Sequence, residues 1–225
     1  MRKMLPLAAL SLCAIASTRA AAAAAPPVAD VVNKMQAFYN GTKDLKGKFK
    51  QVYTDTLYGS KRTSYGYLYV KKPGMMRWNY VSPERKAFIA NGKTLWVWEP
   101  RSKQAFKNPL NTATLGTGLT FLLGSGNLLK EFRISYASDK KDVLGGPDHY
   151  TLKLLPIKPT GQYLYLLLAV RPSDHAVTES VIVQRNARNH FLFTNLETNT
   201  KLRPWRFQFK PPAGTRVINA AKMRK

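Results

Sequence analysis

Apolar and polar residues alternate with a period of two along most of the chain after residue 45, and turn residues interrupt the pattern. Successive side chains of a strand point to opposite faces, so this alternation predicts short strands with one buried face. The turn pair Asn91-Gly92 between two apolar runs is the strongest hairpin signal. So many short strands at regular spacing predict one antiparallel sheet that curls or closes. The predicted strands are 47–54, 63–71, 76–81, 86–90, 94–99, 132–138, 150–155, 162–171, 177–184, 191–197 and 205–209.

Two apolar segments depart from this period. An amphipathic helix of about twelve residues is predicted after Pro26-Pro27, because apolar residues recur there at helical spacing until Gly41. A short helix is predicted at 119–123, inside a segment rich in glycine, threonine and leucine. The expected fold class is therefore mainly β with helices (α+β). The apolar positions of the first helix are Val28, Val31, Val32, Met35 and Phe38.

The first 25 residues have the composition of a secretory signal peptide. Arg2 and Lys3 precede an apolar run over 4–16, and small residues follow over 18–25. We therefore expect residues 1–25 to be cleaved and residues 26–225 to form a single exported domain. The only cysteine, Cys13, lies inside the signal, so the mature chain is expected to hold no disulfide and no thiolate metal site.

Charge and polar residues narrow the function classes. The formal net charge of +24 predicts attraction to anionic surfaces, although a merely soluble basic surface explains it as well. Export argues against nucleic acid as the partner. Neither the three histidines nor the scattered acidic residues have the spacing of a metal site or an acid/base pair, and no nucleophile motif occurs. We therefore expect no catalytic residues, no metal and no cofactor.

The segment 163–170 is hydrophobic at almost every position. A strand that is apolar on both faces needs cover on both, or it leaves one face open to a ligand. Two architectures satisfy this pattern: an ordinary sandwich core, or a half-barrel with an apolar interior covered by the helical segments. The pattern alone does not decide between them.

Four motifs follow one another along the chain after residue 25. The first is Phe49 with Gln51 after an amphipathic helix, and the second is the strand–Pro–strand unit 68–78 with Ser82-Pro83. The third is Asn91-Gly92-Lys93-Thr94-Leu95-Trp96 with Pro100 and Gln104, and the fourth is Phe207-Gln208-Phe209-Lys210-Pro211-Pro212-Ala213-Gly214 with Val217. In this order the motifs resemble the LolA family, the periplasmic carriers of lipoproteins between the inner and outer membranes. The resemblance spans almost all of the chain after residue 25, although between 145 and 203 it is one of pattern only.

The resemblance implies an unclosed β-barrel with a helical lid over a hydrophobic cavity. It also implies a periplasmic monomer that receives acylated lipoproteins from an inner-membrane ABC-type lipoprotein-releasing complex and passes them to an outer-membrane lipoprotein acceptor. That acceptor shares the fold but is itself a lipoprotein, whereas this chain has no lipobox cysteine. A carrier of another acylated lipid such as a glycolipid, a lipoprotein-sensing module of the same fold, and a basic protein-binding module remain as alternatives.

Site residues follow from the strand phase together with the resemblance. In the family an arginine directly before the proline closes the lid through backbone carbonyls of the helices. Here that position is Lys72, which shares a face with Leu68 and Val70, so Lys72 is the predicted lid latch and Arg77 its possible substitute. The predicted acyl-chain cavity consists of Val28, Val32, Met35, Phe49, Leu68, Val70, Met76, Trp78, Leu95, Phe121, Leu122 and Leu123.

Overall fold

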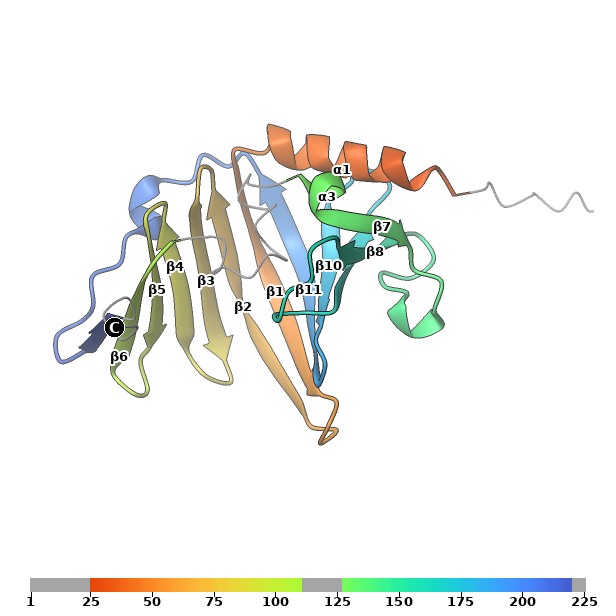
Figure 1. Cartoon of the computed structure of the whole chain (residues 1–225). Coiled ribbons are helices and arrows are strands. Elements are labelled where there is room, and N and C mark those ends of the chain that lie inside the picture. Colours follow the sequence, from red (N-terminus) through yellow and green to blue (C-terminus); the bar gives the residue numbers. More distant parts are fainter. Residues whose placement is uncertain (1–24, 111–126, 220–225) are drawn as a thin grey trace, which may run out of the picture.

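The structure is a computed structural model that describes residues 25–110 and 127–219. Its strands form a single 12-stranded sheet in the order β12-β6-β5-β4-β3-β2-β1-β11-β10-β9-β8-β7. Neighbouring strands are antiparallel, apart from the parallel pair β12–β6. The sheet curves and α1 and α3 lie along one end of it, as Figure 1 shows. One unclosed sheet with helical cover is the half-barrel alternative, and the two-sheet sandwich is excluded for the described residues.

The elements have the following bounds. The helices are α1 (Val28–Gly41), α3 (Leu128–Glu131), η2 (Lys140–Asp142) and η3 (Pro204–Phe207), the last two being 3₁₀ turns. The first six strands are β1 (Asp44–Asp55), β2 (Lys61–Lys71), β3 (Met75–Ser82), β4 (Lys86–Asn91), β5 (Thr94–Glu99) and β6 (Gln104–Pro109). The remaining strands are β7 (Phe132–Tyr136), β8 (Tyr150–Pro156), β9 (Tyr165–Val170), β10 (Val177–Val183), β11 (Ala187–Thr198) and β12 (Arg216–Asn219).

Ten of the predicted strands and the first helix are confirmed, with shifts at their ends. The predicted strand 205–209 is wrong, because Pro204 begins a 3₁₀ turn there and its ring fixes the backbone φ angle. The strands β6 and β12 were missed: β6 carries Lys107, Asn108 and a terminal proline, and β12 is a four-residue edge strand. The helix predicted at 119–123 lies outside the described residues.

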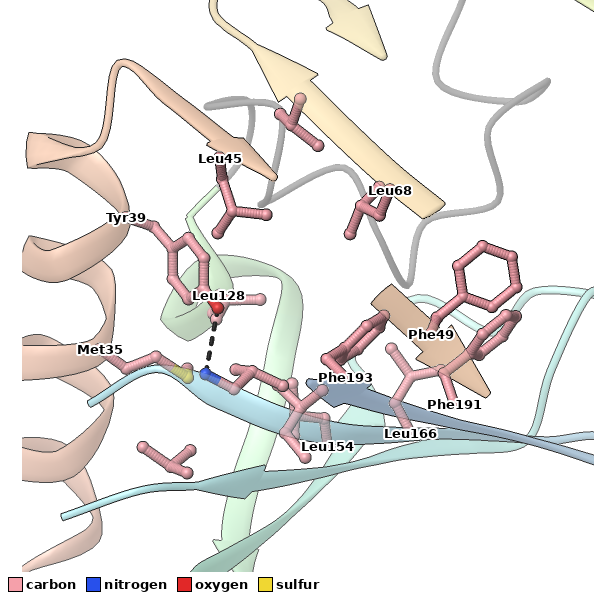
Figure 2. Packing of buried hydrophobic residues seen from close by; sticks show 14 of the residues in the cluster. Met35, Tyr39, Leu45, Phe49, Leu68, Leu128, Leu154, Leu166, Phe191 and Phe193 are labelled. Atoms are coloured by element: carbon pink, nitrogen blue, oxygen red, sulfur yellow. Dashed lines mark hydrogen bonds between the residues drawn. The ribbon is translucent and has the colours of Figure 1, made fainter. Parts of the chain in front are cut away.

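The inner face of the sheet carries the main core. Residues opposite one another in antiparallel register share a face, and the pairs Leu45–Val70 and Phe49–Gly66 set the phase for β1 and β2. Their inward side chains are buried with residues of α1 and of both halves of the sheet in one cluster. We call this cluster and the strand face beneath it the apolar interior (Figure 2).

The outer face is covered at two places, which explains the strand that is apolar on both faces. In β9, Leu166 and Leu168 belong to the apolar interior, whereas Leu167 and Ala169 are buried in a second, smaller cluster with Leu144. The loop over residues 137–149, with η2, supplies that outer cover. Both faces of β9 are thus buried by the chain itself, so this strand presents no open apolar face.

The C-terminal segment provides the second outer cover. Phe207 of η3 is 0 % exposed, and the ring of Phe209 lies 5.5 Å from that of Trp96 and 5.6 Å from that of Trp98. Trp96 and Trp98 therefore share one strand face, as the period-two phase predicts. The family-like ending of the sequence thus covers part of the outer face of β4 and β5.

Candidate functional site

The apolar interior gathers most of the residues predicted to line an acyl-chain cavity. Val28 packs against the interior and is itself only partly buried. Phe121, Leu122 and Leu123 lie outside the described residues. The predicted residues that are buried together in this one cluster are Val32, Met35, Phe49, Leu68, Val70, Met76, Trp78 and Leu95.

An aromatic group occupies the centre of this interior. The Phe49 ring lies 4.9 Å from the rings of both Trp78 and Tyr80. The Phe191 ring lies 5.3 Å from that of Trp78, and it stacks on Phe193 with the ring centroids 6.2 Å apart. Aromatic rings bury large areas and few polar atoms, so this group forms a surface suited to hydrocarbon.

Sequence reasoning missed Phe191 and Phe193, although both lie in a predicted strand. Their Phe-x-Phe spacing places both on one face, but only the pairing Phe49–Phe193 identifies that face as the inner one. Leu152, Leu154, Leu166 and Leu168 were missed for the same reason. The sequence shows which side chains of one strand share a face. It does not show which strand lies beside it, and that pairing is needed to identify the buried face.

A glycine makes room for the aromatic centre. A Cβ atom added to Gly66 would lie 2.5 Å from Cζ of Phe49 and 2.1 Å from the backbone oxygen of Asn79. Both distances are shorter than any tolerated contact. Gly66 therefore leaves room for the Phe49 ring to pack against β2 beside Trp78.

The helix α1 is the lid of this interior, and it is held at both ends. Near its start, the Tyr136 hydroxyl donates a hydrogen bond of 2.7 Å to the backbone oxygen of Pro26. Near its end, the backbone N–H of Val177 donates to the Tyr39 hydroxyl at 3.0 Å, the dashed line of Figure 2. Burial raises the pKa of Tyr39, so the phenol remains neutral. One tyrosine thus joins the lid to β10 inside the core.

We expect Tyr39→Phe to lower the free energy of unfolding by about 1–3 kcal/mol, because the buried N–H of Val177 would lose its acceptor. Urea denaturation of the purified protein measures this change. The control is Tyr58→Phe, which removes a hydroxyl that is exposed and should change stability by less than about 0.5 kcal/mol. Equal effects of the two substitutions would show that the Tyr39 hydroxyl does not hold the lid.

Lys72 lies at the same end of the lid. Its ammonium donates a hydrogen bond to the backbone oxygen of Tyr39, which also accepts from the N–H of Thr42. Burial lowers the pKa of Lys72, so the charged form depends on this contact for part of its solvation. Whether Lys72 acts as a latch remains a prediction.

Arg77, the possible substitute, occupies the other face of the sheet. Its guanidinium donates to the backbone oxygen of Arg206 at 2.9 Å and to Asn79 at 3.0 Å, so it is tied to η3. An arginine engaged with the outer cover is not in position to hold α1. We therefore correct the sequence-based assignment and keep Lys72 alone as the proposed latch.

Between residues 25 and 110 and between 127 and 219, no three His, Cys, Asp or Glu side chains converge as metal ligands would. In the same ranges, no helix has the length and hydrophobicity to span a bilayer. The chemistry that these residues offer is the burial of apolar groups beneath a helix.

Comparison with known proteins gives consistent matches. The family model described as "Outer membrane lipoprotein carrier protein LolA" matches residues 40–210. Curated relatives named outer-membrane lipoprotein carrier protein include one from Chromobacterium violaceum, 25% identical, covering 91% of this chain and 95% of its own. Another, from Coxiella burnetii, is 28% identical and covers 84% of this chain and 87% of its own.

One solved structure supports the fold. It is an uncharacterized conserved protein from Thermus thermophilus, with a TM-score of 0.55 at 9% identity. The match covers 85% of this chain and 98% of the other. At that identity the likeness concerns the fold alone.

Proposed function

This chain belongs to the LolA family of outer membrane lipoprotein carrier proteins, and we propose that it binds lipoproteins by their acyl chains and carries them across the periplasm. The observation that carries the proposal is the family match over residues 40–210, which includes most strands of the apolar interior. The protein acts by binding, and its residues form or break no covalent bond in the cargo.

The physical task explains why an apolar interior is needed. Each methylene group kept from water contributes about 0.8 kcal/mol, so a free acylated lipoprotein does not stay dispersed in water. An interior of aromatic and branched side chains replaces the membrane during transit. Because the described interior is buried beneath α1, acyl chains enter only when α1 moves away from the sheet.

Closure of α1 makes the binding reversible. In the closed form the lid helix buries Val31, Val32 and Met35 against the sheet. Acyl chains compete with these side chains for the same inner face. A ligand shifts such an equilibrium only by its difference in affinity for the two forms, so a stable closed form weakens cargo binding and favours delivery.

Location and partners follow from the same role. We propose that residues 1–25 direct export and are removed, leaving residues 26–225 as one carrier domain in the periplasm. Its partners are then acylated lipoproteins, an inner-membrane ABC-type complex that releases them, and an outer-membrane acceptor lipoprotein.

We expect the purified protein to release lipoproteins from spheroplasts of its native host into the medium as a soluble complex. Immunoblotting for a lipidated lipoprotein measures this release, and a version of the same lipoprotein without its acylated cysteine serves as the negative cargo. In the host, depletion of the protein should cause outer-membrane lipoproteins to accumulate in the inner membrane. Absence of both effects would overturn the lipoprotein-carrier proposal.

A further inference from the structure

A polar pocket opens on the inner face at the end of the sheet away from α1. Its volume is about 500 Å³, within the usual range for sites that hold small ligands. It lies where β1 and β2 approach the turn that joins them. That turn is at the foot of the sheet in Figure 1. We call it the mouth pocket, and its lining residues are Gln51, Tyr53, Asp55, Ser60, Lys61, Arg62, Ser64 and Lys86.

The lining of the mouth pocket is net positive, because it carries Lys61, Arg62 and Lys86 against a single carboxylate, that of Asp55. Neither Arg62 nor Lys86 has a carboxylate partner within 4 Å among residues 25–110 and 127–219. The one acidic lining residue, Asp55, is already engaged: its carboxylate accepts hydrogen bonds from the backbone N–H groups of Leu57 and Tyr58. That carboxylate is held at the β1–β2 turn and forms no ion pair with Arg62 or Lys86, so neither of these two cations has a close ion-pair partner in the described part of the chain.

Register places both cations on the inner face. Arg62 lies opposite Tyr53, which has the phase of Phe49, and Lys86 lies opposite Tyr80. The Lys86 ammonium stands 4.4 Å from the centroid of the Tyr80 ring, which itself packs 4.9 Å from the Phe49 ring. The mouth pocket thus adjoins the aromatic centre of the apolar interior. The Tyr80 ring lies between the Lys86 ammonium and the Phe49 ring.

A bound anion would stabilise the charged form of Lys86. Burial lowers the pKa of Lys86 and the nearby charge of Arg62 lowers it further, while the carboxylates of Glu99 and Glu84 partly offset this lowering. Two like charges held close to an apolar surface cost free energy, and a bound anion would lower that cost. Because both side chains keep contact with water, each ion pair contributes a modest, salt-sensitive part of the affinity.

We propose that the mouth pocket holds an anionic group, a phosphate or a carboxylate, carried by the acylated ligand whose chains occupy the adjoining interior. This inference rests on the proposed carrier function and extends it, since acyl-chain binding alone requires no charge on the cargo. It assigns Arg62 and Lys86 to headgroup recognition and the aromatic centre to the chains. The ligand class is an anionic amphiphile.

The test compares two probes that differ only in a phosphate group: a monoacylglycerol and the corresponding monoacylglycerol 3-phosphate, each below its micelle concentration. We expect the phosphate probe to bind about tenfold more tightly at low salt, with the preference falling as salt is added. The double variant Arg62→Gln/Lys86→Gln, which keeps Lys61, should lose most of this preference. The matched control Lys34→Gln/Lys210→Gln removes the same charge at exposed positions and should keep the preference.

The outcomes separate this proposal from the carrier function. Equal binding of both probes to the unmodified protein, or an undiminished preference in the Arg62→Gln/Lys86→Gln variant, would overturn the mouth-pocket proposal and leave the carrier function standing. Failure of both probes to bind would count against the carrier function itself. sn-Glycerol 3-phosphate, which has the headgroup without the chain, should not compete at the same concentration, and competition would identify a free-anion site instead.

Discussion

Replacing Asp142 with alanine should lower the free energy of unfolding by about 2–4 kcal/mol, because it removes the buried partner of two cations. The Asp142 side chain is 0 % exposed and accepts hydrogen bonds from Lys153 at 3.1 Å, Arg188 at 3.0 Å and the Tyr165 hydroxyl at 3.2 Å. The expected loss lies below that of a fully buried pair because about a quarter of each cation remains exposed. Chemical denaturation measures the change.

The matched control for Asp142 is Glu84→Ala. Glu84 also pairs with an arginine at 3.0 Å, but both Glu84 and Arg101 are more than half exposed. An exposed pair of this kind contributes about 0–1 kcal/mol. If the two variants unfolded at the same denaturant concentration, the contacts of Asp142 would not be what stabilises the packing of the loop 137–149 on the outer face of the sheet.

The effect of Asp142 should depend on pH in a defined direction. Burial alone would raise the pKa of Asp142, but hydrogen bonds from Arg188, Lys153 and Tyr165 outweigh it, and the net shift is downward. A carboxyl whose pKa is lowered by folding stabilises the protein above its ordinary pKa of about 4, and the stabilisation disappears as the pH falls through the lowered value. The difference in stability between the unmodified protein and Asp142→Ala should therefore be constant near neutral pH and shrink in acid.

The Asp142 cluster also shows what sequence reasoning could and could not reach. The segment 163–170 indicated correctly that β9 needs cover on both faces. The cover comes from the loop 137–149, and η2 within it is tied to β8, β9 and β11 by a single carboxylate. No local pattern marks an isolated aspartate as the partner of an arginine 46 positions away.

The wrong strand at 205–209 has a similar cause. The run Trp205-Arg206-Phe207-Gln208-Phe209 alternates with a period of two, which is the strand signal itself. In the structure a 3₁₀ turn followed by extended backbone brings Phe207 and Phe209 to the same outer face. Alternation predicted correctly that these two rings share a face, but it could not distinguish a strand from a covering segment that packs across strands.

Strand phase also predicted only part of the candidate site, because it gives the face of a residue but not its partner on another element. Strand phase places Leu68, Val70 and Lys72 on one face, and the structure has the first two in the apolar interior. Phase could not supply the partner of Lys72, because Tyr39 lies 33 residues earlier on a separate helix. The family resemblance, and not the strand phase, predicted that the residue before the proline contacts a backbone carbonyl of a helix. The strand phase places Arg77 on the opposite face of the sheet, which agrees with its hydrogen bond to the backbone oxygen of Arg206.

Replacing Lys72 with leucine should trap cargo in the carrier. The contact between the Lys72 ammonium and the Tyr39 carbonyl exists only while α1 is closed, and a hydrogen bond involving a charged group contributes about 1.5–3 kcal/mol. Its loss would destabilise the closed form, so acyl chains would meet less competition from the lid. Because Lys72 is partly exposed, we expect about tenfold tighter retention, equivalent to about 1.4 kcal/mol. Displacement of a fluorescent fatty acid and transfer of lipoprotein to outer membranes measure retention and delivery.

The neighbouring lysine is the matched control for this experiment. Lys71 lies on the opposite face, 3.9 Å from the carboxylate of Asp44, so Lys71→Leu makes the same chemical change without touching the lid. Lys72→Arg should preserve delivery, because a guanidinium keeps the charge and offers five donors to the same end of α1. If Lys72→Leu delivered cargo as fast as the unmodified protein, closure would have to depend on other contacts of the lid, of which the Tyr39 hydroxyl is the next to remove. If instead Lys72→Leu alone retained cargo, one ammonium at the end of an apolar strand would set the balance between holding lipid and passing it on.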